Sequence, residues 1–139
     1  MSKKVLIIED HIQMRAMLAL GLRYMDYEPL EAGDGYAGIE KTVADHPDLV
    51  LLDLGLPGIS GLDTAKRIKE NPQTGNIPII AFSGWDPREF EAKAREAGMA
   101  AYLQKPVSLR EIARRIEMLT QSDTPSSSET LLIGIRRGV

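Results

Sequence analysis

The sequence contains no cysteine among its 139 residues. Disulfide bonds, thiolate zinc sites and cysteine nucleophiles are therefore excluded, and an intracellular location is permitted. With only two histidines, His11 and His46, a metal site built from several histidines is excluded as well. No apolar run approaches the ~20 residues of a membrane-spanning helix, and the first residues lack the apolar region of a signal peptide. We expect a soluble, cytoplasmic protein that does not bind membranes.

The charge balance does not favour binding of a polyanion. The formal net charge is -3 at pH 7, so no broad cationic surface for nucleic acid or anionic lipid is expected. A hydrophobic content of 43% and a charged content of 27% are typical of soluble globular proteins. A chain of 139 residues suits one compact domain and not two.

Short apolar segments alternate with segments of helical spacing along the first 120 residues. Five segments rich in leucine or β-branched residues predict strands: 5–8, 28–32, 49–52, 77–82 and 100–103. Apolar spacing, capping residues and flanking Pro or Gly predict five helices: 14–25, 36–46, 62–70, 87–97 and 108–119. This alternation predicts an α/β fold, a parallel sheet with helices on both faces. In the first helix, Met14, Met17 and Met25 belong to an apolar stripe that we expect to face the core.

The composition changes near residue 120. Residues 1–120 are predicted to form the domain, and 121–139 a Ser-rich flexible linker with a short apolar and basic tail. The apolar run from Leu131 to Ile135 could add a strand to a sheet edge, dock on a partner, begin a further region or belong to a disordered terminus.

Polar residues follow four of the predicted strands at their carboxyl ends: Glu9 and Asp10, Asp53, Ser83 and Gly84, and Gln104 with Lys105 and Pro106. Ligands of open α/β sheets bind beyond these ends, so we expect the groups to share one pocket. Carboxylates ~4 Å apart repel each other by roughly 4 kcal/mol at an effective dielectric constant of ~20, so cations must offset them. Lys105 supplies one positive charge, and Mg²⁺, or Mn²⁺ in its place, supplies two. The pattern therefore predicts a site for a metal ion and a phosphoryl group.

These motifs, in this order and at these separations, resemble the receiver domains of two-component response regulators, the CheY-like superfamily. The resemblance covers residues 3–119 and rests on four motifs: Glu9-Asp10, Asp53 with the following Leu-Gly-Leu-Pro-Gly, Ser83-Gly84, and Tyr102 to Pro106. It implies a flavodoxin-like, doubly wound sheet of five strands in the order 2-1-3-4-5, with five helices. It also implies a signalling phosphoacceptor that catalyses only its own phosphorylation and slow dephosphorylation, and is not a turnover enzyme.

By this resemblance, Asp53 accepts a phosphoryl group from a sensor histidine kinase, a histidine phosphotransfer protein or a small donor. Asp10, Asp53 and the backbone carbonyl of Gly55 would ligate Mg²⁺, and Glu9 would hold a metal-bound water. A carboxylate is a competent nucleophile toward phosphorus, and phosphoryl transfer depends mainly on positioning and on charge neutralisation.

The resemblance also implies a switch. Lys105 would pair with Asp53 and then with a phosphoryl oxygen, while Ser83 and Gly84 would bind the phosphoryl group. Drawing Ser83 inward would vacate space for Tyr102, and the fourth helix, fifth strand and fifth helix would form the docking face for an unknown downstream protein. The peptide bond before Pro106 is often cis in such domains.

Ordinary structural roles stay open for these residues. Asp53 could be a turn carboxylate, and Asp10 could cap the first helix, because Asp10 and Gln13 have the spacing of a capping box. Lys105 could be a surface lysine, Ser83 a loop serine, and an aromatic residue on the last strand could simply pack.

Gly55 and Trp85 are distinctive within the resemblance. Gly55, two residues after Asp53, has no side chain to position an attacking water, and Trp85, two after Ser83, could shield an acyl phosphate. We therefore expect slow self-dephosphorylation.

Two other functions compete with a receiver. An Asp-nucleophile phosphohydrolase would usually carry a second carboxylate two residues after the nucleophile, where this chain has Gly55. A pseudo-receiver binding module that is not phosphorylated would lack part of the acidic and lysine set, and none is missing. We expect no DNA-binding module and no direct contact with nucleic acid, and a monomer or weak homodimer.

Overall fold

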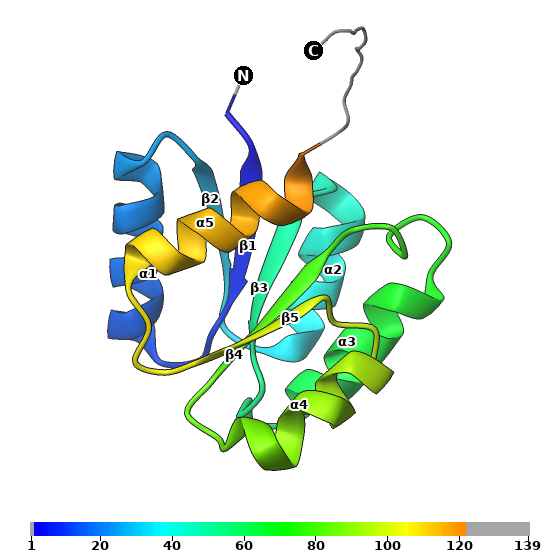
Figure 1. Cartoon of the computed structure of the whole chain (residues 1–139). Helices are drawn as coiled ribbons and strands as arrows, with labels where there is room; N and C mark the ends of the chain where they lie inside the picture. The colour runs from blue at the N-terminus through cyan, green and yellow to red at the C-terminus, as the bar shows by residue number, and fades with distance from the viewer. Residues whose placement is uncertain (1, 122–139) are drawn as a thin grey trace, which may run out of the picture.

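The computed structural model describes residues 2–121 as five strands and five helices in strict alternation (Figure 1). The order is β1 (Lys4–Ile8), α1 (Ile12–Tyr24), β2 (Glu28–Ala32), α2 (Gly35–Asp45), β3 (Leu49–Asp53), α3 (Gly61–Glu70), β4 (Ile79–Ser83), α4 (Pro87–Glu96), β5 (Ala101–Gln104) and α5 (Leu109–Thr120). Apart from Gln121, the predicted linker and tail lie outside the described residues. Among residues 2–121, no helix has the length and apolar character needed to cross a bilayer.

The five strands form one parallel sheet in the order β2-β1-β3-β4-β5. The predicted fold class and strand order are therefore confirmed. Strand β2 is added on one side of β1, and β3, β4 and β5 follow on the other side, so the order of strand addition reverses between β1 and β3. The carboxyl ends of these two strands therefore border the place where such folds bind ligands.

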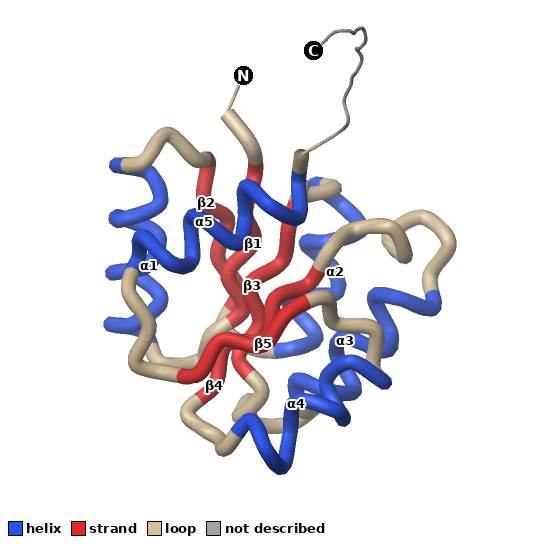
Figure 2. The backbone as a smooth tube through the Cα atoms, viewed as in Figure 1, coloured by secondary structure: helices blue, strands red, loops and turns tan. Residues whose placement is uncertain are grey.

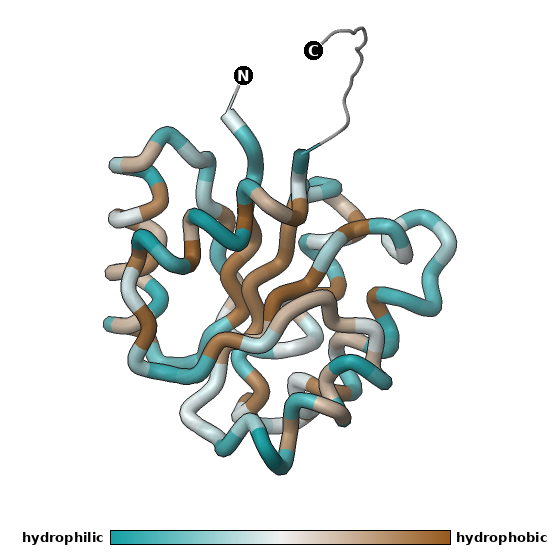
Figure 3. Tube along the Cα trace, viewed as in Figure 1, coloured by the Kyte–Doolittle hydropathy of each residue, from teal (hydrophilic) through white to brown (hydrophobic). Residues whose placement is uncertain are grey.

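Each face of the sheet is buried under its own helices (Figure 2). Alternate strand residues such as Ile7 and Leu51 pack with Leu22 of α1 and Ile112 of α5. The intervening residues pack under α2, α3 and α4. Figure 3 shows the resulting apolar centre, with hydrophilic residues along most of the outer helices. Burial on both faces explains why β3 and β4 lack the polar alternation of one-sided strands.

Side chains that accept hydrogen bonds begin the helices. Asp34, Ser60, Asp86 and Ser108 each accept a bond from a backbone N–H of the first helical turn. Such caps satisfy donors that have no partner inside the helix. The alternative role of Asp10 as a helix cap is not found: His11 caps α1, its Nδ1 accepting from Met14 N at 3.2 Å. Asp10 is therefore not used as a cap.

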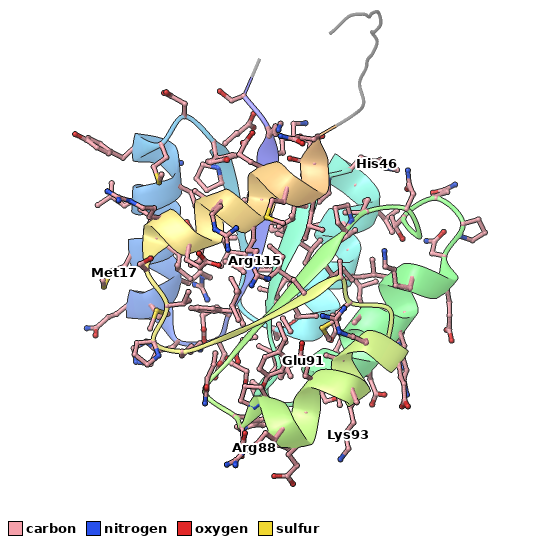
Figure 4. All side chains as sticks on the ribbon, in the orientation of Figure 1. Met17, His46, Arg88, Glu91, Lys93 and Arg115 are labelled. Atoms are coloured by element: carbon pink, nitrogen blue, oxygen red, sulfur yellow. The ribbon has the colours of Figure 1, made fainter. Side chains whose placement is uncertain are left out.

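Two other predictions needed correction. Strand β4 begins at Ile79 rather than at residue 77, because the Ile77 N–H is bonded to the Thr74 carbonyl and Pro78 has no N–H to offer. The methionine stripe of α1 is only partly core: Met17 is 70% exposed and lies on the outer side of the helix (Figure 4). The buried face of α1 is instead formed by Leu18, Ala19 and Leu22.

Candidate functional site

Three carboxylates meet at the carboxyl ends of β1 and β3. Glu9 and Asp10 directly follow β1, and Asp53 is the last residue of β3, which pairs with β1 in parallel. Each carboxylate offers one oxygen, and these oxygens all lie within 4.8 Å of one another. The sequence separates these residues by more than forty positions, and the parallel register brings them together as predicted.

Lys105 brings a positive charge to the carboxylates from the loop after β5. Its Nζ lies 2.9 Å from Glu9 Oε1 and 3.6 Å from Asp53 Oδ2. It also lies 4.7 Å from the centroid of the Phe82 ring, a cation–π distance. The Lys105–Pro106 peptide bond is cis, as expected, and Lys105 N donates to the Ser83 carbonyl at 2.7 Å. The predicted partner was Asp53, whereas the shorter contact is with Glu9.

Glu9 is almost fully buried, with 2% exposure. Burial alone would raise the pKa of its carboxyl. The His11 N–H, which donates to Oε2 at 3.0 Å, and the Lys105 ammonium outweigh burial and lower the pKa of Glu9. Glu9 therefore carries its charge in the folded protein.

Asp53 is also buried but is held differently. Burial and the neighbouring Glu9 charge raise the pKa of the Asp53 carboxyl, and the Gly55 N–H bond and Lys105 only partly offset this. The Gly55 N–H donates to Asp53 Oδ1 at 3.1 Å. The other oxygen, Oδ2, is the one that lies on the side of Lys105, 3.6 Å from its ammonium.

The donor set fits a hard divalent cation. Two buried carboxylates and the exposed Asp10 present oxygen ligands only, the type that Mg²⁺ and Mn²⁺ prefer. The cluster has three carboxylates, and the ammonium of Lys105 contacts two of them, those of Glu9 and Asp53. The negative charge left over favours binding of a cation.

Ser83, the last residue of β4, is buried beside the site at 1% exposure. Its Oγ accepts a hydrogen bond from Trp85 N at 3.0 Å. The Ser83 hydroxyl also interacts with the Tyr102 hydroxyl, an interaction that by itself lowers the pKa of Tyr102. A Cβ built on the adjacent Gly84 would meet no heavy atom within 4 Å. The backbone of this loop therefore has open space beside it, in which a phosphoryl oxygen could lie.

The side chain of Tyr102, a residue of β5, lies in the protein interior. Its side chain is buried, and its hydroxyl donates to the Trp85 carbonyl at 2.9 Å. Burial raises the pKa of the Tyr102 hydroxyl, which therefore remains a donor at neutral pH. The tyrosine is thus bonded to the loop that also carries Ser83.

Trp85 lies over the loop that follows Asp53. A Cβ built on Gly55 would lie 3.5 Å from the indole Cζ2 and 3.9 Å from Asp53 Oδ1. The indole also lies beside the Phe90 ring, with ring centroids 4.6 Å apart. Trp85 is 40% exposed, so it is only partly covered by the protein.

Sequence reasoning missed two supporting residues. Arg15 donates to the Glu9 carbonyl at 2.8 Å and pairs with Glu31 at 3.2 Å, which fixes the backbone at the acidic pair. Phe90 supports the Trp85 ring. Arg15 lies one helical turn after His11, and Phe90 one turn after Asp86, so their positions on the first turns of α1 and α4 were the available signals.

Comparison with known proteins agrees with this geometry. The family model of the response regulator receiver domain matches residues 5–117. The phosphate regulon transcriptional regulatory protein PhoB of Pseudomonas aeruginosa is 35% identical over 127 residues, which are 91% of this chain and 56% of that protein. This chain thus spans little more than half the length of PhoB.

Two further relatives match over most of their own length. The polar-differentiation response regulator DivK of Brucella ovis is 33% identical over 110 residues, covering 78% of this chain and 89% of DivK. A solved receiver domain of a Pseudomonas aeruginosa sensor histidine kinase, with a magnesium ion in its active site cleft, shares the fold. Its TM-score is 0.80 at 23% identity, covering 86% of this chain and 98% of that one. The chain belongs to the response regulator receiver domain family.

Proposed function

We propose that residues 1–120 form a phosphoacceptor domain in which Asp53 receives a phosphoryl group. The observation that carries the proposal is the meeting of Glu9, Asp10, Asp53 and Lys105 at the carboxyl ends of β1, β3 and β5. An oxygen of the Asp53 carboxylate attacks phosphorus, the bond to the donor breaks, and the donor leaves with the bonding electron pair. The product is an aspartyl phosphate. Membership of the family and the complete set of site residues support this assignment.

Asp10, Asp53 and the Gly55 carbonyl are the proposed ligands of Mg²⁺, and Glu9 holds a water of the ion. The ion supplies positive charge that offsets the charge on the transferring group. Mg²⁺ binds proteins through one or two carboxylates and keeps several waters, which suits a site with one exposed carboxylate. The magnesium ion in the related receiver structure also supports this assignment.

Lys105, Ser83 and Gly84 are the proposed binding groups for the phosphoryl oxygens. Lys105 holds its ammonium 3.6 Å from Asp53 Oδ2, so it can turn from the carboxylate to a phosphoryl oxygen with little motion. The Ser83 hydroxyl has a proton to donate. Gly84 has no side chain to block the approach of the phosphoryl group.

The proposed donors are a sensor histidine kinase or a histidine phosphotransfer protein, and both DivK and PhoB are regulators by name. We assign the protein no turnover of its own beyond gain and slow loss of this phosphoryl group, and a cytoplasmic location.

The proposed output surface consists of α4, β5 and α5. Trp85 accepts from the Tyr102 hydroxyl and donates to Ser83, which links the pocket to β5 through two hydrogen bonds. Ala94 is the one fully buried residue of α4, so this helix is loosely anchored and can shift at low cost. Phosphorylation should therefore alter amide hydrogen exchange in α4 and β5 more than in α2, which serves as the control. Equal changes in all three elements would refute this surface.

Mass spectrometry of the intact protein tests the phosphoacceptor. Incubation with acetyl phosphate and Mg²⁺ should add one phosphoryl group, and EDTA should prevent the addition. The Asp53→Asn variant should show no adduct, whereas Asp63→Asn, the same change at an exposed position on α3, should behave as the wild type. An adduct on the Asp53→Asn variant would overturn the assignment. Continuous hydrolysis of phosphoesters would instead favour a phosphohydrolase.

A further inference from the structure

An apolar groove of about 560 Å³ runs between α1 and α5. Its walls include Met14 and Met17 from α1 and Leu109 and Ile112 from α5. Met17, on the outer side of α1 in Figure 4, is 70% exposed. The volume falls within the range of ~300–1,000 Å³ that is usual for sites that bury an apolar ligand. Apolar surface gathered in one concave place indicates a binding site.

The groove adjoins the phosphoacceptor pocket. Lys105 lines the groove, and its ammonium contacts Glu9 and Asp53 in the pocket. Pro106, held by the cis peptide bond, lines the groove as well. A segment bound in the groove would therefore end beside three carboxylates that face a single ammonium.

The chain itself carries a segment of matching chemistry. Residues 131–137 read Leu-Leu-Ile-Gly-Ile-Arg-Arg, four large aliphatic side chains followed by two arginines. The aliphatic part matches the apolar walls, and the arginines match the acidic pocket at the end of the groove. These residues lie outside the described part of the chain, and no part of the phosphoacceptor chemistry uses them.

The segment can reach the groove without strain. Helix α5 runs from Leu109, on the wall of the groove, to Thr120, a distance of about 16 Å at the helical rise per residue. The ten residues 121–130 can span up to ~33 Å when extended. A tether of this length keeps the segment at an effective concentration of about millimolar near the groove, so even a weak contact is populated.

We propose that residues 131–137 bind in cis in the groove between α1 and α5, with the aliphatic side chains on Met14 and Met17 and the arginines toward the acidic pocket. The bound segment would cover the surface beside the phosphoacceptor pocket, so a protein that approaches Asp53 over this groove must displace it. The inference concerns regulation, and it holds whether or not Asp53 is phosphorylated.

Paramagnetic broadening of methionine methyl signals tests the contact. Because the sequence has no cysteine, a Thr130→Cys variant carries one nitroxide, placed just before the apolar run. With ¹³C-methyl methionine, the Met14 and Met17 signals should lose most of their intensity and regain it when ascorbate reduces the nitroxide. Met99, buried on the opposite face of the sheet, should keep its intensity. Undiminished Met14 and Met17 signals would overturn the proposal.

Variants in the tail distinguish broadening caused by binding of the apolar run from broadening caused only by the covalent tether that keeps the label nearby. Leu132→Asp with Ile133→Asp should restore the Met14 and Met17 signals, because charged groups do not bind in an apolar groove. Ser126→Asp with Ser127→Asp, which adds the same charge outside the run, should leave the broadening in place. Equal broadening in both variants would refute binding of the apolar run.

A mixed sample distinguishes the chain's own tail from a second copy. Spin-labelled chains without ¹³C are mixed with ¹³C-labelled chains without a nitroxide. Sharp Met14 and Met17 signals in this mixture support binding in cis, and broadened signals overturn it in favour of a dimer. None of these readouts involves phosphorylation, so this inference and the phosphoacceptor assignment can fail independently.

Discussion

Replacing Asp53 by its isosteric amide, asparagine, should stabilise the protein in the absence of a divalent cation. The Asp53 oxygen lies within 4.8 Å of an oxygen of Glu9 and of Asp10, and Asp53 Oδ2 lies 3.6 Å from the Lys105 ammonium. At an effective dielectric constant of ~20, each repulsion is worth at least about 3.5 kcal/mol and the attraction about 4.6 kcal/mol. The repulsions exceed the attraction by about 2 kcal/mol, and screening at the exposed Asp10 lowers this figure. We expect Asp53→Asn to raise the free energy of unfolding by about 1–2 kcal/mol in EDTA.

Magnesium should reduce or reverse this gain. A ligand at ten times its dissociation constant stabilises the folded state by about 1.4 kcal/mol, and the Asp53→Asn variant lacks one anionic ligand. Wild-type stability should therefore rise more steeply with Mg²⁺ than that of the variant. Urea denaturation followed by circular dichroism, with and without Mg²⁺, measures both effects, and equal denaturant slopes confirm that stability alone has changed.

The control for charge is Glu40→Gln, which removes one negative charge from the exposed surface of α2. Its stability should change by less than about 0.5 kcal/mol and should not depend on Mg²⁺. A variant Asp53→Asn that is less stable than the wild type in EDTA would show that the attraction of Lys105 outweighs the repulsion within the cluster. The account of the site as a cluster with excess negative charge would then be wrong.

Three further changes test other parts of the structure. Trp85→Ala should speed the loss of the aspartyl phosphate after removal of the donor, because it uncovers the pocket; an unchanged half-life by phosphate-sensitive gel or mass spectrometry would contradict shielding. Gly61→Ala should lower the free energy of unfolding by about 1–3 kcal/mol, because a Cβ there would lie 2.5 Å from a backbone oxygen at the end of β3. The control Gly84→Ala should change it little, because a Cβ at Gly84 would meet no heavy atom within 4 Å. Equal denaturation midpoints of the two variants would refute this difference. Tyr27→Phe should cost about 1 kcal/mol at pH 7, because the tyrosine hydroxyl lowers the pKa of Glu117. A lowered pKa stabilises the fold above the ordinary glutamate range and not below it, so this cost should fade as the pH drops through the pKa of Glu117; a cost that is constant from pH 7 to pH 3 would argue against it.

The sequence alone was sufficient to predict that the candidate site lies at the carboxyl ends of the strands. Glu9, Asp10 and Lys105 follow strands and Asp53 ends one, and in a parallel sheet the carboxyl ends of all strands share one edge. This inference needs only the order of elements, which continuous apolar runs and capping residues indicate well.

Finer details of the site depend on side-chain geometry, which sequence spacing does not give. Lys105 lies between two carboxylates, and only the distances show that Glu9 is the nearer partner. Asp10 has the spacing of a capping residue, but in the structure His11 Nδ1 accepts the Met14 N–H and caps α1. Met17 has the spacing of a core residue but lies at the edge of the apolar stripe, beside the groove. In each case the sequence pattern is compatible with more than one arrangement of neighbouring residues, and the packing of the folded chain determines which one forms.

The two sides of the candidate site differ in how firmly they are packed against the core, and the proposed switch needs such a difference. The carboxylates follow the central strands β1 and β3, whose large side chains are almost entirely inaccessible to solvent. The Trp85 loop leads instead into α4, where Ala94 is the one buried residue. If Asp53 is phosphorylated as proposed, the new charge would lie between the firmly packed strand ends on one side and the less firmly packed Trp85 loop on the other. Because Trp85 is hydrogen-bonded to both Ser83 and Tyr102, we expect a movement of this loop to reach β5.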